Sequence, residues 1–192
     1  MLPDWSIKHV NYYLHLALDL AMATETLRQR CFSRTIGALL VKNDNIIATG
    51  FNGPPRGIPT CDSWSGNWKA EGARKDVLFL EKKKCPRYEL NYQSGQGLHL
   101  CPAVHAERNT LLMCAKNGIS TDKGILYLTC GVPCKDCMVE IIQAGIQGIF
   151  CADDKIYDNL SWRLSQKARL PVMYYNGKLK KLVDGKFVTV EG

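Results

Sequence analysis

The sequence predicts a layered α/β domain. Short apolar segments of strand length alternate with segments whose apolar residues recur at helical intervals. Turn-forming pairs separate these segments, as at Asn117-Gly118 and Asp184-Gly185. The chain has 192 residues, 46% of them hydrophobic and 22% charged, which is enough to bury the core of one domain. Strands that alternate with helices indicate a sheet packed in layers with helices.

The elements follow in order along the chain. Residues 5–30 lack proline and glycine and carry a helical apolar pattern, which predicts one long amphipathic helix. A hairpin comes next, with a buried strand at 35–41, a turn at 43–45 and a returning strand at 46–51. Further helices are predicted at 104–118, 134–145 and 159–168, strands at 124–129, 147–151 and 170–175, and a hairpin at 178–190.

We predict one domain at 1–175, interrupted by a long loop insert at 58–100. Residues 176–192 are predicted to form a C-terminal β-hairpin tail of the same domain. A loop as long as 58–100 inside a compact domain is normally functional or partly disordered.

Composition limits the classes of protein to which the chain can belong. The formal net charge of +7 suggests an anionic partner but does not separate a mononucleotide from a polynucleotide. No apolar run reaches the roughly 20 residues of a membrane helix, and the first residues lack the pattern of a secretory signal. We therefore expect a cytoplasmic protein with no membrane partner. Its nine cysteines then favour metal binding and reduced thiols over disulfides.

Three residues, His105, Cys134 and Cys137, have the composition of a catalytic zinc site. Catalytic zinc takes three such ligands and keeps a fourth position for water. The cysteines stand three apart at the head of a predicted helix, so both sulfur atoms can reach one metal. His105 and Glu107 are predicted in the first turn of another helix. Two helix N-termini that converge on a metal favour thiolate and hydroxide.

Glu107 distinguishes this pattern from simpler sites. His-x-Glu followed by Pro-Cys-x-x-Cys is the signature of zinc nucleobase deaminases, in which a glutamate that is not a ligand transfers protons. A Cys-x-x-Cys pair is also found in structural zinc knuckles and in redox pairs. A structural site usually takes four protein ligands, and zinc would mask both thiolates, so neither alternative gives Glu107 a role.

Four segments, each quoted with its sequence, resemble the deoxycytidylate (dCMP) deaminase family of the cytidine-deaminase superfamily. They are 33–38 (SRTIGA), 50–57 (GFNGPPRG), 104–109 (VHAERN) and 141–146 (IIQAGI). The resemblance extends over about residues 7–158, and the proline after the second glycine of 50–57 points to the deoxycytidylate branch. It implies a three-layer α/β/α cytidine-deaminase-like fold with a central five-stranded mixed sheet.

The resemblance also implies an activity. The chain would be a zinc-dependent hydrolytic deaminase that converts dCMP to dUMP and ammonia and supplies dUMP for dTMP synthesis. His105, Cys134 and Cys137 would hold the catalytic Zn²⁺, which lowers the pKa of its bound water. Glu107 would be the catalytic proton shuttle, a role that needs a dry pocket to raise its pKa towards neutrality.

Substrate-binding residues follow from the same resemblance. Asn52 matches an asparagine that contacts the sugar, Tyr157 resembles a tyrosine against base and sugar, and Ala106 belongs to the histidine motif at the substrate. Arg34 and Arg56 are candidates for the phosphate, because a planar guanidinium binds phosphate oxygens in pairs. Asn52 could instead be only a turn former, and either arginine only a surface residue.

Four more cysteines lie before, within and directly after the long loop: Cys31, Cys61, Cys85 and Cys101. Their spacing fits either a metal that pins the loop or four ordinary buried cysteines. The resemblance favours a second, structural Zn²⁺, because family members of the bacterial, archaeal and phage type carry cysteines in these places. Cys114, Cys130 and Cys151 are predicted to be core residues.

Family members are commonly hexamers that dCTP with Mg²⁺ activates and dTTP inhibits. The resemblance therefore implies a homohexamer with these two nucleotides as effectors and dCMP as the small-molecule substrate.

The sequence departs from the family pattern at three places. The segment between Cys61 and Cys85 is longer, one extra residue precedes Pro133, and the Tyr157 segment aligns with a one-residue shift. These changes leave the zinc chemistry intact and leave dCTP or a 5-substituted dCMP open as substrates.

Two rival classes of protein remain. Deaminases of tRNA adenosine, of polynucleotide cytidine and of the riboflavin pathway share the zinc signature, but segment 50–57 speaks against them and against a nucleic-acid partner. A catalytically silent zinc module that binds nucleic acid or a protein would not need Glu107.

Overall fold

The computed structural model describes residues 7–23, 31, 34–58, 85, 87, 90–93 and 95–190. Residues 5–6 and 24–30 of the first predicted helix, Cys61 and most of the loop at 58–100 lie outside this part of the chain. None of the helices within it combines the length and apolar character that crossing a bilayer requires.

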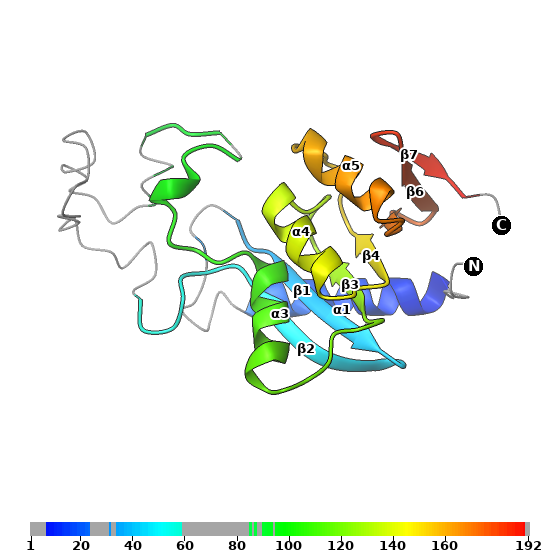
Figure 1. Ribbon diagram of the computed structural model, residues 1–192, viewed down its shortest axis with the longest axis horizontal. Helices are drawn as coiled ribbons and strands as arrows, with labels where there is room; N and C mark the ends of the chain where they lie inside the picture. The colour runs from blue at the N-terminus through cyan, green and yellow to red at the C-terminus, as the bar shows by residue number, and fades with distance from the viewer. Residues whose placement is uncertain are drawn as a thin grey trace.

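The described strands form one mixed sheet in the order β2-β1-β3-β4-β5-β6-β7 (Figure 1). Their bounds are β1 Gly37–Lys42, β2 Asn45–Phe51, β3 Ile125–Leu128, β4 Gly148–Cys151, β5 Val172–Tyr175, β6 Leu179–Val183 and β7 Lys186–Thr189. β3, β4 and β5 run parallel, and all other neighbours run antiparallel. The expected strand number of five is wrong. Within the described residues the sheet has seven strands, because the C-terminal hairpin pairs with β5 through β6.

The first hairpin agrees closely with the prediction. Asn43 and Asp44 both have left-handed backbones, with φ of 50° and 59°, as a two-residue type I′ turn requires. β1 begins two residues later than predicted, and just before it the side-chain oxygen of Asn52 accepts the N–H of Ile36 at 2.8 Å. This bond holds the start of the strand against the segment that follows β2.

Helices cover both faces of the sheet, which confirms the predicted layering. α1 (Ile7–Ala23) packs on one face, and α3 (Ala106–Lys116), α4 (Lys135–Gln143) and α5 (Asn159–Lys167) lie on the other (Figure 1). Alternate residues of β1 enter the two cores: Leu39 and Val41 face α1, whereas Ala38 and Leu40 face the layer of α3 and α4. A strand buried on both faces is apolar throughout, which is why its sequence predicted a strand.

α3 lies unusually close to β2. A Cβ atom on Gly50 would stand 2.4 Å from the backbone oxygen of Ala106 and 2.3 Å from Thr110 Oγ1, so only glycine allows this approach. Asn109 Nδ2 donates to the backbone oxygen of Phe51 at 2.6 Å. The contact fixes the N-terminal half of α3, which carries the candidate site, at the end of the hairpin.

Candidate active site

His105, Cys134 and Cys137 come together at the N-terminal ends of two helices. Their ligand atoms all lie within 4.8 Å of one another. His105 Nδ1 is 3.3 Å from Cys137 Sγ and 3.5 Å from Cys134 Sγ. The prediction of two convergent helix starts agrees with this geometry, but His105 lies one residue before its helix rather than in the first turn. Its extended backbone continues the bridge that Val104 forms with Gly53.

These three side chains fit a zinc ion. They offer one imidazole nitrogen and two sulfur atoms, and Cys134 and Cys137 are 8% and 1% exposed. Zinc prefers such nitrogen and sulfur ligands, and a site with three of them keeps one position open. The helices also support each other here, because Arg108 of α3 forms a bidentate pair with Glu140 of α4 at 2.9 and 2.8 Å.

Hydrogen bonds shift the pKa values of the two thiols in opposite directions. A hydrogen bond with Cys137, assisted by one with His105, lowers the pKa of the Cys134 thiol. The same hydrogen bond with Cys134, together with burial, raises the pKa of Cys137. The hydrogen bond with Cys134 also raises the pKa of His105. Deprotonation is therefore favoured at Cys134 over Cys137, and a divalent cation that binds both sulfurs displaces the thiol protons that remain.

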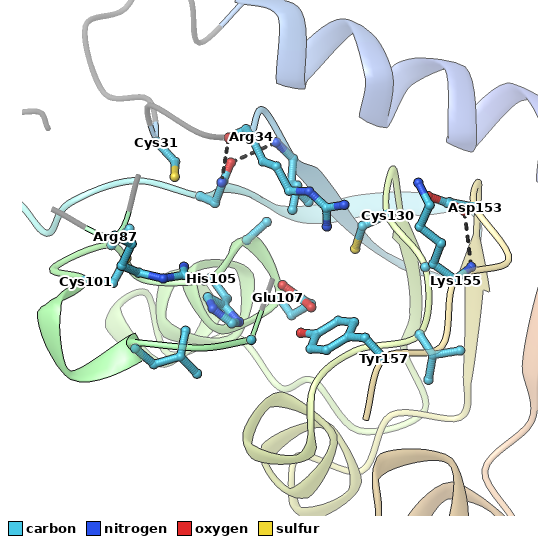
Figure 2. Close-up of a pocket in the computed structure, with 18 of the residues that line it drawn as sticks. Cys31, Arg34, Arg87, Cys101, His105, Glu107, Cys130, Asp153, Lys155 and Tyr157 are labelled. Atoms are coloured by element: carbon cyan, nitrogen blue, oxygen red, sulfur yellow. Dashed lines mark hydrogen bonds and ion pairs between the residues drawn. The ribbon is translucent and has the colours of Figure 1, made fainter. Parts of the chain in front are cut away.

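Glu107 is a buried carboxyl beside this cluster. It stands in the first turn of α3 and is 4% exposed. Burial raises the pKa of its carboxyl, and the charge of His105 opposes that shift. Figure 2 shows the carboxyl at the centre of the site, with the ring of Tyr157 beside it. A carboxyl with a raised pKa can both accept and donate protons near neutral pH.

A cavity of about 270 Å³ opens over these groups. Among its lining residues are five that the sequence proposed around a substrate: Arg34, Asn52, Ala106, Glu107 and Tyr157. The volume is close to the lower end of small-molecule sites, roughly 300 Å³. The cavity can therefore take one small molecule beside His105 and Glu107, which both line it.

The predicted substrate-binding residues differ in their surroundings. The amide of Asn52 is committed to the backbone: its oxygen accepts from Ile36 N and its nitrogen donates to Arg34 O, both at 2.8 Å. Arg34 extends its guanidinium into the cavity (Figure 2). Arg56 is exposed in the turn after the loop and is not among the lining residues. The structure thus brings one of the two candidate arginines to the site.

Several lining residues had no signal in the sequence. Lys155 forms an ion pair with Asp153 at 3.2 Å at one end of the cavity. Arg87 lines it as well, and its guanidinium donates to the backbone oxygens of Gln96 and Gln93 at 2.6 and 3.2 Å. Cys130, predicted as a core residue, also lines the cavity. Only the fold brings these segments together, so no local motif could have identified them.

The four cysteines of the proposed second metal site are only partly placed. Cys31 and Cys101 line the cavity and Cys85 is buried, whereas Cys61 lies outside the described residues. Within the part of the chain that the structure describes, His105, Cys134 and Cys137 are the one group of at least three such side chains close enough to share a metal. Cys114 and Cys151 are buried in the core as expected.

Known proteins resemble this chain in both sequence and fold. Residues 8–153 match the family described as the cytidine and deoxycytidylate deaminase zinc-binding region. The deoxycytidylate deaminase of Saccharomyces cerevisiae is 28% identical over 176 residues, which cover 92% of this chain and 46% of the yeast protein. That of Schizosaccharomyces pombe is 30% identical over 174 residues, with 90% and 44% covered. The chain thus spans less than half the length of these two relatives.

The fold comparison agrees with the predicted architecture. The crystal structure of dCMP deaminase from the cyanophage S-TIM5 in complex with dCMP and dUMP superposes with a TM-score of 0.62 at 22% identity, covering 89% of this chain and 99% of that one. This likeness confirms the α/β cytidine-deaminase-like fold. Because the family match extends over 8–153, well over half of the sequence, the chain belongs to the family of the cytidine and deoxycytidylate deaminase zinc-binding region.

Proposed function

We propose that the protein is a zinc-dependent hydrolytic deaminase that converts dCMP to dUMP and ammonia, supplying dUMP for dTMP synthesis. The observation that carries the proposal is the buried Glu107 carboxyl beside His105, Cys134 and Cys137 at the base of a small cavity. The deoxycytidylate deaminases among the relatives support dCMP as the substrate.

His105 through Nδ1 and the two cysteines through their sulfur atoms would hold the zinc ion. When bound, zinc supplies a Lewis acid that lowers the pKa of a water molecule towards neutrality. Glu107 moves the protons. It receives the first proton of the water and delivers it to the ring nitrogen of cytosine. It then takes the second proton, from the hydroxyl now bonded to the ring carbon, and passes it to the departing amine. Water thereby replaces the amine, and the products are uracil in the nucleotide and ammonia. Burial supports this role, because it raises the pKa of Glu107.

The cavity walls would bind the nucleotide. We assign Tyr157 and Ala106 to the base and sugar. Asn52 is assigned to the sugar, because its amide keeps a second N–H and a second oxygen lone pair beyond its two backbone hydrogen bonds. Arg34 is assigned to the phosphate: among the described residues its guanidinium has no ion-pair or hydrogen-bond partner, and it points into the cavity. Arg56 is not among the lining residues, and only the sequence supports it as a phosphate ligand.

Ammonia release from a panel of substrates tests the proposal. The panel is dCMP, dCTP, 5-methyl-dCMP, cytidine and a tRNA, each with and without dCTP and Mg²⁺. We expect turnover of dCMP. Turnover of dCTP, 5-methyl-dCMP or tRNA in its place would support the zinc chemistry but contradict dCMP as the substrate. Silence on the whole panel by zinc-loaded protein would overturn the proposed activity.

We also propose a structural zinc held by Cys31, Cys61, Cys85 and Cys101. Its support is the resemblance, together with the position of Cys31 and Cys101 on one cavity wall. Metal analysis of the purified protein should give two zinc ions per chain, and Cys61→Ser should give one. A ratio of one in the unsubstituted protein would contradict the second site.

The remaining proposals concern assembly and regulation. We propose that the protein is a cytoplasmic homohexamer. We also propose that dCTP with Mg²⁺ activates it and that dTTP inhibits it. Only the resemblance supports these proposals. The dCTP arm of the substrate panel, a dTTP titration and light scattering of the purified protein test them.

A further inference from the structure

Two loops meet beside the candidate metal ligands and are joined by backbone contacts. One loop, residues 130–134, leads into α4 and carries Cys134. The other, residues 153–158, follows β4 and carries Tyr157. Val132 N donates to Lys155 O at 3.0 Å. A Cβ atom on Gly131 would stand 2.3 Å from that same oxygen, so the backbones are in direct contact.

Asp158 joins the same loops through its carboxylate. One oxygen, Oδ1, caps α5 by accepting from Leu160 N at 3.0 Å and Ser161 N at 3.3 Å. The other, Oδ2, accepts from Lys135 N at 2.7 Å, the first N–H of α4. A single carboxylate therefore satisfies the N-terminal donors of two helices. Ser161 adds a second link, because its hydroxyl donates to Pro133 O at 2.5 Å.

α4 needs this help because of the residue at its start. Cys134 is its N-cap residue, and its side chain makes no capping hydrogen bond. The preferred N-cap residues, Ser, Thr, Asp and Asn, accept a backbone N–H of the first helical turn through their own side chain. In this chain the Cys134 side chain is a candidate metal ligand, and Asp158 supplies an acceptor from the neighbouring helix.

The bond to Lys135 N bears directly on the Cys134 sulfur. The peptide between the two residues is planar, so the direction of the Lys135 N–H is set by ψ of Cys134, which is 166°. A carboxylate that holds this N–H therefore holds the backbone of Cys134 and the direction in which its side chain leaves. Tyr157 directly precedes Asp158 and lines the cavity (Figure 2).

We propose that Asp158 is a positioning residue that holds Cys134 in its metal-binding orientation and couples it to the cavity wall at Tyr157. The inference rests on the proposed zinc site and not on the identity of the nucleotide. Groups outside the ligand sphere of a metal commonly change its affinity by about 10- to 100-fold.

Asp158→Ser separates the two roles of the carboxylate. Serine is as good an N-cap as aspartate, but its one short side chain cannot also reach Lys135 N. Asp158→Asn is the second variant: its amide oxygen can cap α5, while its NH₂ group cannot accept from Lys135 N. Asp184→Asn is the matched control for the lost charge, because Asp184 is an exposed turn residue with φ of 47°, a conformation asparagine tolerates.

Two measurements on the full chain decide the question. The zinc dissociation constant comes from competition with a chromophoric chelator, and if two classes of zinc are bound, the class that His105→Ala removes is the one scored. The absorption bands of the Co²⁺-substituted protein report the geometry at the sulfur ligands. We expect zinc affinity about 10- to 100-fold weaker and shifted Co²⁺ bands in both Asp158 variants, with Asp184→Asn unchanged.

Unchanged affinity and bands in both Asp158 variants would overturn the inference and reduce Asp158 to a helix cap. Absence of zinc from the unsubstituted protein would instead defeat the proposed zinc site itself. Unchanged far-ultraviolet circular dichroism in the serine variant confirms that a weaker affinity does not come from unfolding.

Discussion

Arg34 and Arg56 flank the same hairpin, yet their surroundings differ. Both are exposed, but Arg34 extends into the cavity, whereas Arg56 is not among the residues that line it. The sequence offered both as phosphate ligands, because nothing in either segment says which way the side chain leaves. Spacing did point to His105, Glu107, Cys134 and Cys137, since each pair stands within one helical turn. Residues that converge only through the fold, such as Arg87 and Lys155, carried no comparable signal.

Arg34→Met should weaken binding of dCMP and leave the chemical step nearly unchanged. Hydrogen bonds to charged groups contribute about 1.5–3 kcal/mol, so we expect KM for dCMP to rise about 10- to 100-fold with little change in kcat. Arg56→Met is the matched control and should behave as the unsubstituted protein. Steady-state ammonia release checks both, and a larger effect at Arg56 would reverse the assignment.

Glu107→Gln should abolish turnover without removing zinc. The amide keeps the shape of the carboxyl but cannot carry a proton between water and the base, and such proton transfer contributes about 10²- to 10⁴-fold in rate. We expect kcat to fall by at least this factor and the zinc content to match the unsubstituted protein. Appreciable activity in the zinc-loaded variant would exclude Glu107 as the proton shuttle.

Helices and strands were predictable because their apolar residues repeat with the period of the element. The pattern at 104–118 predicted α3, and that at 134–145 predicted α4. Their first residues were less predictable, because His105 stays extended through the bridge of Val104 to Gly53, a contact between distant segments. This detail matters chemically, since His105 and Cys134 both lie at helix N-caps rather than within helices.

The contact between α1 and β3 predicts a loss of stability at alkaline pH. Tyr127 is 3% exposed, and its ring lies 5.0 Å from that of Tyr13 and 5.1 Å from that of Phe150. Burial, assisted by Tyr13, raises the pKa of Tyr127 above its ordinary value. The unfolded chain therefore releases this proton first as pH rises beyond about 10. The stabilising contribution is complete below that pH and is lost above it, with a slope of up to about 1.4 kcal/mol per pH unit.

Urea unfolding between pH 8 and 11 checks this prediction. Tyr127→Phe should show a smaller decline of the unfolding free energy with pH than the unsubstituted protein. Tyr92 is 40% exposed, and Tyr92→Phe serves as the control that should leave the decline unchanged. Equal slopes in all three proteins would show that the Tyr127 hydroxyl has no part in alkaline unfolding.

At the scale of the whole molecule, the layers were predictable and the width of the sheet was not. Alternation of strands and helices predicts the layering directly. The expected strand number came from a resemblance that ends near residue 158, whereas β5, β6 and β7 all follow that point. The hairpin at 178–190 was recognised from its own turn, but its sequence does not state that β6 pairs with β5. Which strands pair depends on the whole sheet, so the sequence of one segment does not reveal it.

The joined sheet predicts that the C-terminal hairpin unfolds together with the rest of the protein. Leu182 of β6 is 5% exposed and packs in the same core as α4 and α5, whereas Val188 of β7 is 53% exposed. Truncation of a buried leucine to alanine costs about 2–5 kcal/mol, and truncation of an exposed residue stays within about 0.5 kcal/mol. Leu182→Ala should therefore lower the free energy of unfolding by about 2 kcal/mol or more, with Val188→Ala as the matched control. Unfolding followed by circular dichroism and by tryptophan fluorescence should shift as one transition. An unshifted main transition in Leu182→Ala would mean that the hairpin is a separate tail, because a residue outside the cooperative core cannot change the stability of that core.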